Sequence, residues 1–174
     1  QQLDAAQMIV SGEPGGDLVA GVSAAAFRGA GDRMHVPVIV EVEGSPAEID
    51  EQLALVHAIA ERHNPIEFRE SQSEAESQRI WLGRKSAFGA MGKINDYMCL
   101  DGTIPVSALP EVLRSIGEMS RSYGLDVANV FHAGDGNLHP LILFDANRPG
   151  DLAKCEAFGA DILRLCVSVG GCLT

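Results

Sequence analysis

Two histidines, His132 and His139, flank a glycine-rich turn in the segment HAGDGNLHP. If Asp135 and Gly136 are the two central residues of a tight hairpin turn, His132 lies directly opposite His139. Opposed residues of a hairpin share one sheet face with Cβ atoms about 4.5–5.5 Å apart, so both imidazoles would reach one divalent metal ion. The alternative is that one histidine packs and the other is solvated, while Asp135, Gly136 and Asn137 only support the turn.

A catalytic metal site needs more than this pair. Such sites usually have three protein ligands and one open position, and a third ligand is not evident in the sequence. The other histidines, His35, His57 and His63, have no spacing that joins them to the pair. We expect these three to be surface or core residues.

An arginine, Arg84, lies among small residues in the segment IWLGRKSAFGAMGK. Small neighbours allow another element to approach closely, and a guanidinium beside such a gap can bind a carboxylate through two parallel hydrogen bonds. The alternative is that Arg84 and Lys85 form a solvated pair at a helix end. Trp81 is expected in the core.

The composition indicates a globular protein whose charge disfavours polyanions. The chain has 174 residues, of which 46% are hydrophobic, and a formal net charge of −11. Nucleic acid is therefore not expected as a partner. No apolar run approaches the roughly 18 residues of a transmembrane segment. We expect the four cysteines to be reduced core residues and not a disulfide framework, which favours a cytoplasmic location; they are Cys99, Cys155, Cys166 and Cys172.

Periodicity and capping signals predict the elements that hold these side chains. Ser45 with Glu48, and Ser73 with Glu76, have the capping-box spacing that starts a helix, and Gly124 suits the end of a third helix. In chain order we expect a strand over 36–44, a helix over 46–62, a strand over 65–71 and a helix from about 74 to 89 or 92. A strand over 96–106, broken near 101–102, and a helix over 109–123 follow. Two strands over 127–145 and a last helix introduced by Pro149 complete the order.

This order predicts an α+β fold, ferredoxin-like, with a mostly antiparallel sheet and helices packed on one face. Residues 1–35 are small and glycine-rich, and we expect a poorly defined N-terminal segment of helix fragments and loops there. Residues 36–174 form the domain. Because the sequence stops at VGGCLT directly after the last helix, we expect an excised piece of a larger protein, truncated at the C-terminal end of this domain.

Two longer segments, RKSAFGAMGKINDYMCLDGTIPVSALPEVL and ANVFHAGDGNLHPLILFDAN, resemble a known family. They are similar to the C-terminal, substrate-side cap domain of the FAD-linked 2-hydroxy-acid oxidases and dehydrogenases, and the resemblance covers about residues 37–174. It is closest to the flavin subunit of bacterial glycolate oxidases, with D-lactate and D-2-hydroxyglutarate dehydrogenases as relatives.

The resemblance implies a role for each site residue. His132 and His139 would be ligands of a divalent metal, either zinc, manganese or iron, beside the flavin. The metal would polarise the α-hydroxyl and carboxylate of the substrate, a general base would take the hydroxyl proton, and hydride would pass to the flavin N5. Arg84 matches the arginine that family members use to bind the substrate carboxylate.

Two departures from the family pattern limit what this chain is expected to do alone. The family continues with a G-E-H-G motif that supplies a third ligand and the base, and its FAD is bound mainly by a preceding domain. We therefore expect no catalytic base in this chain, weak binding of metal and FAD, and no turnover. Cys99 and Leu141 replace a Lys and an Asn that bind the second carboxylate in D-2-hydroxyglutarate enzymes, which favours a small substrate, glycolate or D-lactate.

The partners expected from the resemblance are a small 2-hydroxy acid, the FAD-binding domain of the same protein and other oxidase subunits, which would allow a peripheral position at a membrane. Two alternatives remain from the residues alone. One is a stand-alone ferredoxin-like binding or assembly module without redox activity. The other is an independent metal-binding protein, which would bind zinc tightly by itself.

Overall fold

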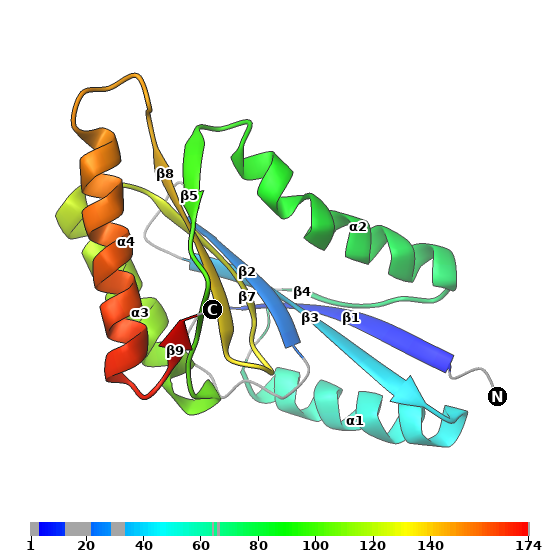
Figure 1. The fold of residues 1–174 in the computed structure, drawn as a ribbon. Helices are drawn as coiled ribbons and strands as arrows, with labels where there is room; N and C mark the ends of the chain where they lie inside the picture. Colours follow the sequence, from blue (N-terminus) through cyan, green and yellow to red (C-terminus); the bar gives the residue numbers. More distant parts are fainter. Residues whose placement is uncertain (1–3, 13–21, 29–33, 64, 66, 174) are drawn as a thin grey trace.

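The computed structural model describes residues 4–12, 22–28, 34–63, 65 and 67–173. Within these residues nine strands form one sheet in the order β4-β1-β3-β2-β7-β8-β6-β9, with β5 also paired to β8, and Figure 1 shows this arrangement. Every pair is antiparallel. The strands are β1 (Asp4–Gly12), β2 (Val22–Arg28), β3 (Met34–Gly44), β4 (Glu67–Glu70), β5 (Asp96–Cys99), β6 (Gly102–Thr103), β7 (Val127–His132), β8 (Asn137–Phe144) and β9 (Cys172–Leu173).

Four α-helices of the described chain connect these strands, and the prediction of an α+β fold is confirmed. They are α1 (Pro46–Arg62), α2 (Glu74–Met91), α3 (Leu109–Tyr123) and α4 (Asp151–Ser168), with one 3₁₀ turn at Val106–Ala108. The ferredoxin-like topology and the division at residue 35 stay predictions. No helix within the described residues is both long and apolar enough to cross a bilayer.

The predicted helix ends are confirmed by their hydrogen bonds. The Ser45 amide donates to the Glu48 carboxylate at 2.8 Å, and the Ser73 hydroxyl accepts from the Glu76 amide at 3.3 Å. Both contacts satisfy amide groups that the first turn of a helix leaves without an intrahelical partner. At the end of α3, Gly124 has φ +65°, the left-handed conformation that glycine adopts without strain.

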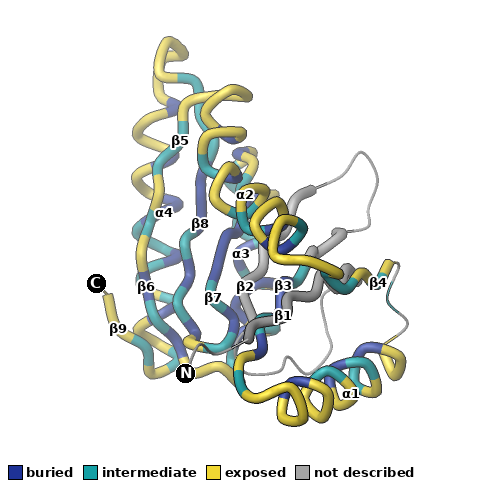
Figure 2. Tube along the Cα trace, turned by 90° about the vertical axis from the view of Figure 1, so that its right-hand side faces the viewer, coloured by how far each residue is buried: buried dark blue, intermediate teal, exposed yellow. Residues whose placement is uncertain are grey.

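Helices α1, α3 and α4 pack against one face of the sheet. Val42 of β3 and Phe131 of β7 share an apolar cluster with Ile49 of α1, Ile116 of α3 and Phe158 of α4. Figure 2 shows that most of β7 and β8 is buried. Since each fully buried apolar side chain contributes about 1.5–3 kcal/mol, this cluster is the main source of stability.

Helix α2 covers the opposite face, so the prediction that the helices pack on one face is wrong for α2. Ala87 and Met91 of α2 contact Ala128, Val130 and Leu141 of β7 and β8. These strand residues alternate with those that face the other helices. In Figure 1, α2 lies above the strands and α1 below them. Periodicity shows that a helix has an apolar side, but not which sheet face that side meets.

The opening segment contains strands where helix fragments and loops were expected. β1 pairs with both β3 and β4, and β2 pairs with β3 and β7. Their sequences, DAAQMIVSG and VSAAAFR, are rich in alanine, which has a low strand propensity by itself. Pairing on both edges overrides that propensity, and this pairing is not visible in the local sequence.

The predicted broken strand is confirmed, and a proline on its partner explains the break. β5 and β6 pair with successive parts of β8. Between them the Leu100 amide donates to the Pro140 carbonyl at 3.0 Å. Pro140 has no N–H with which to return a ladder hydrogen bond, so the strand is interrupted while its register continues.

Candidate functional site

The turn between β7 and β8 has four residues instead of the expected two. His132 pairs with Asn137, and His139 pairs with Val130. The Asp135 amide donates to the His132 carbonyl at 3.1 Å, which closes the turn. The prediction that His132 lies directly opposite His139 is therefore wrong.

The two imidazoles still lie on the same sheet face. The actual register differs from the expected one by two positions, and an even difference preserves the face because side chains alternate with a period of two. The ring centroids of His132 and His139 lie 5.7 Å apart, with their planes at 86°. This face is the one that α2 covers, since Val130 and Leu141 also belong to it.

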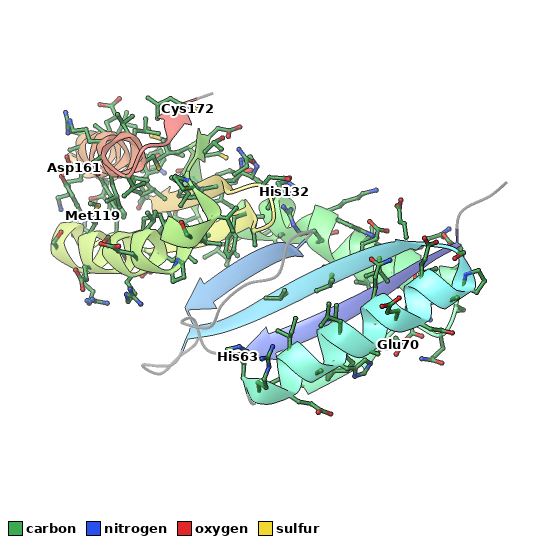
Figure 3. The ribbon with its side chains drawn as sticks, turned by 90° about the horizontal axis from the view of Figure 1, so that it is seen from below. His63, Glu70, Met119, His132, Asp161 and Cys172 are labelled. Atoms are coloured by element: carbon green, nitrogen blue, oxygen red, sulfur yellow. The ribbon has the colours of Figure 1, made fainter. Side chains whose placement is uncertain are left out.

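The other histidines do not join this pair. His57 on α1 lies against Phe68, with ring centroids 3.9 Å apart, and its Nε2 lies 3.4 Å from a Glu70 carboxylate oxygen. His63 is exposed at the end of α1, well apart from His132 in Figure 3. The side chain of His35 lies outside the described residues.

A carboxylate that the sequence did not single out, Asp101, faces His139 from the segment between β5 and β6. The pairings of β5 and β6 on either side of it place Asp101 in register opposite His139. One carboxylate oxygen, Oδ2, lies 3.7 Å from His139 Nδ1. The other, Oδ1, accepts a 2.8 Å hydrogen bond from the Asn137 side-chain amide. Asn137 therefore does more than support the turn, because it also holds Asp101.

Helix α2 supplies the other side of the site. Phe88 meets His139 edge-on, with ring centroids 6.2 Å apart, and Arg84 lies one helical turn earlier, near enough to act on the charge of His139. Burial lowers the pKa of the Arg84 guanidinium from its ordinary value. Arg84 is thus a partly desolvated cation beside the histidine pair. Its neighbour Lys85 is exposed.

The surroundings of His139 favour its neutral form at pH 7. Burial lowers the pKa of His139, and the electrostatic effects of nearby His132 and Arg84 lower it further, whereas Asp101 raises it. A neutral imidazole has a lone pair that can bind a metal ion, and a protonated one does not. The site thus keeps His139 in the form that a metal ligand requires.

The donor set provides two of the protein ligands that a catalytic metal takes. Imidazole nitrogens suit zinc and iron, and both rings lie on one face. Within the part of the chain that the structure describes, no group of three His, Cys, Asp or Glu side chains is arranged to hold an ion. The metal therefore stays a prediction, with His132 and His139 as its ligands.

The turn itself depends on Gly136, as expected, although for an additional reason. Its φ is +69°, and its carbonyl accepts a 2.9 Å hydrogen bond from the Ile104 amide. A Cβ at this position would overlap the Ile104 carbonyl oxygen. Glycine thus allows the turn to dock on the segment that follows β6. Asp135 is exposed at the turn.

Replacing Gly136 with alanine should strongly destabilise the protein. Positive φ costs about 1–2 kcal/mol for a residue with a side chain, and the overlap with Ile104 adds about 1–3 kcal/mol. Gly124→Ala is the matched control, because Gly124 has a similar φ of +65° and no described atom within 4 Å of the added Cβ. Urea unfolding should show a clearly larger loss for Gly136→Ala. Equal losses in both variants would contradict the docking role.

The two positions that were expected to bear on substrate size also lie at this site. Cys99 pairs with Leu141 across β5 and β8, directly beyond Asp101 and His139. Leu141 is fully buried beneath α2, and Cys99 is an exposed free thiol. Neither side chain offers a positive charge or an amide to a second carboxylate. The prediction that the cysteines are core residues is wrong for Cys99 and Cys172, which are exposed, and confirmed for Cys155 and Cys166, which are buried.

Comparisons with known proteins bear on the family and the fold of this chain. The family model for FAD linked oxidases, C-terminal domain, matches residues 6–174. Glycolate oxidase subunit GlcD of Escherichia coli (strain K12) is 51% identical over 138 residues, which are 79% of this chain and 28% of that protein. The mitochondrial D-lactate dehydrogenase (cytochrome) of Arabidopsis thaliana is 30% identical over 141 residues, 79% of this chain and 25% of that protein. The chain thus spans about a quarter of the length of these relatives.

A solved structure supports the fold. The structure of 4-ethylphenol oxidase from Gulosibacter chungangensis, in an isoeugenol complex, matches 97% of this chain and 45% of that chain with a TM-score of 0.66. The sequence identity is 9%, so this likeness concerns the fold alone.

Proposed function

Since this chain belongs to the family of FAD linked oxidases, C-terminal domain, we propose that it is the substrate- and metal-binding cap domain of an FAD-dependent 2-hydroxy-acid dehydrogenase. The resemblance found in the sequence is thereby confirmed at the level of the family. The substrate, the metal and the roles of single residues are the proposal.

One observation carries this proposal. The β7–β8 hairpin places the rings of His132 and His139 5.7 Å apart on the face that α2 covers, and α2 presents the partly buried cation Arg84 to the same place. A 2-hydroxy acid has an anionic carboxylate beside a hydroxyl group. Two imidazoles for a metal ion, next to a cation for the carboxylate, match these two groups.

Oxidation of a 2-hydroxy acid removes a hydride from C2 and a proton from the hydroxyl, and leaves a 2-oxo acid. A divalent ion at His132 and His139 would supply Lewis-acid polarisation of the hydroxyl and carboxylate, and FAD would supply the acceptor for the hydride. Arg84 binds the carboxylate and fixes the orientation of the substrate. Because Arg84 is partly desolvated, its attraction for an anion is less screened than at an open surface.

The proposed substrate is small, glycolate or D-lactate. Beyond His139, the strand continues with Leu141, which is buried beneath α2, and with Cys99 opposite it. A second carboxylate at this end would be desolvated next to groups that cannot pair with it, which is costly. D-2-Hydroxyglutarate is therefore expected to be a poor substrate.

Anaerobic stopped-flow reduction of the flavin tests the proposed function in the full protein that contains this chain. Glycolate and D-lactate should reduce the flavin rapidly, and D-2-hydroxyglutarate should do so at least about 10-fold less efficiently, which equals about 1.4 kcal/mol. Reduction by none of the three acids would contradict the proposal. Faster reduction by D-2-hydroxyglutarate would overturn the proposed substrate size and leave the reaction class intact.

The activity is proposed for the whole protein and not for these 174 residues alone. Within the described residues the site offers two metal ligands where a catalytic site usually has three. The proposal assigns the further groups that turnover uses, including those that bind FAD, to other parts of the protein. Other oxidase subunits, a cytoplasmic location and a peripheral position at a membrane belong to the same proposal.

A further inference from the structure

We propose that Asp101 is a positioning residue that orients His139 for metal binding. It would hold the His139 proton on Nδ1, so that the lone pair of Nε2 is available to the ion. This inference rests on the proposed function, because it assumes that His139 is a ligand. Metal-binding histidines commonly donate their second ring N–H to a carboxylate, which fixes both the tautomer and the ring orientation.

The register of the sheet places Asp101 beside His139. Asp101 lies opposite His139 because β5 and β6 keep one register along β8 across the interruption at Pro140. Directly opposed residues of antiparallel strands share a face. The carboxylate therefore reaches the ring from its side, with Oδ2 3.7 Å from Nδ1.

Asn137 links Asp101 to the rest of the hairpin. Asn137 pairs with His132, and its side-chain amide donates to Asp101 Oδ1 at 2.8 Å. One carboxylate oxygen is thus held by the hairpin, while the other faces Nδ1 of His139. These contacts connect His132 to His139, the two predicted metal ligands, through Asn137 and Asp101.

The position of Asp101 fits a positioning role better than a third ligand. Its carboxylate faces Nδ1 of His139 and is anchored there by the hairpin. The His139 side chain is 19% exposed and that of Asp101 is 46% exposed, so the carboxylate lies toward solvent and the ring lies inward under α2. A ring held from its outer side has Nε2 directed away from the carboxylate.

Metal affinity tests this inference in the full protein after chelation of its metal. Zinc binding is titrated in competition with a chromophoric chelator. Asp101→Ala should weaken zinc binding by about 10–100-fold, and Asp101→Glu should recover part of the affinity. The flavin reduction rate of Asp101→Ala should return toward the wild-type value at saturating zinc, because the ligands themselves are intact. An unchanged zinc affinity in Asp101→Ala would overturn the inference.

Two further variants identify the cause of the effect. Asp50→Ala removes one exposed negative charge on α1 and should leave zinc affinity unchanged. If Asp50→Ala lost as much zinc affinity as Asp101→Ala, the loss would reflect net charge and not the position of Asp101, which would contradict the inference. Asn137→Ala should weaken binding less than Asp101→Ala, and its effect should nearly vanish in the double variant, because Asn137 acts through Asp101. Additive effects would contradict that link.

The two proposals fail in distinguishable ways. If the wild-type protein bound neither zinc, manganese nor iron, or if His139→Ala bound zinc as tightly as the wild type, the metal part of the proposed function would fail together with this inference. If zinc binding depended on His132 and His139 but not on Asp101, only the inference would fail. Circular dichroism and thermal unfolding of each variant establish that it is folded. Should Asp101→Ala be unfolded, Asp101→Asn serves instead, and wild-type zinc affinity in that folded variant would overturn the inference.

Discussion

Replacing His132 or His139 with alanine should slow flavin reduction by glycolate or D-lactate by about 100-fold or more, equal to at least about 2.7 kcal/mol in the barrier. The two rings share one face and lie 5.7 Å apart, so loss of either leaves a single imidazole for the metal ion. The effect should fall mainly on the maximal rate, because the proposed metal would polarise the reacting group. Stopped-flow measurement in the full protein gives this rate directly.

His63→Ala is the matched control for both variants. His63 is an exposed histidine at the end of α1, well apart from the site, so its loss should leave the rate within about twofold of the wild-type value. Wild-type rates in both His132→Ala and His139→Ala would remove the histidine pair from the site. A loss of rate in only one variant would show that the other histidine is not a required ligand.

Replacing Arg84 with alanine should instead weaken substrate binding. Hydrogen bonds to charged groups contribute about 1.5–3 kcal/mol, so KM for glycolate or D-lactate should rise about 10–100-fold. Because Arg84 is partly buried, water screens the lost interaction less, so the rise in KM should lie at the upper end of this range. Steady-state kinetics over a wide substrate range separate the change in KM from any change in kcat.

Two variants of the same helix sharpen this test. Lys85→Ala removes the adjacent cation, which is exposed, and should leave KM unchanged. Arg84→Lys keeps the charge but loses the planar two-point hydrogen bonding, so it should recover only part of the affinity. Equal effects of Arg84→Ala and Lys85→Ala would indicate general electrostatic attraction instead of a specific carboxylate site.

The sequence predicted elements with strong local signals. The starts of α1 and α2 follow from the capping residues Ser45 and Ser73, and the end of α3 follows from Gly124. These signals act within one helical turn, so they are visible without knowledge of the fold. β1 and β2 were missed because their alanine-rich sequences form strands only through pairing with β3, β4 and β7.

The histidine pair was predicted for a reason that is partly wrong. A two-residue turn was expected, but the turn has four residues, and its Gly136 contacts Ile104 outside the hairpin. The pair remains on one face because the difference is even. Had the turn contained one residue more or one fewer, one of the two histidines would have faced the main core instead.

Asp101 could not be identified as a site residue from local sequence. Its relation to His139 depends on the pairing of β5 and β6 with β8, strands separated by all of α3. The available signal was the predicted break near Asp101, which places a carboxylate at the interruption of a strand. That signal indicates an irregularity but not its partner.

The central claim is that His132 and His139 hold a divalent metal ion, and the metal content of the purified full protein tests it most directly. Elemental analysis should find about one zinc, manganese or iron ion per flavin in the wild-type protein and in His63→Ala. His132→Ala and His139→Ala should retain the flavin and lose most of the metal. The same metal-to-flavin ratio in all four proteins, or no divalent metal in the wild type, would contradict the claim.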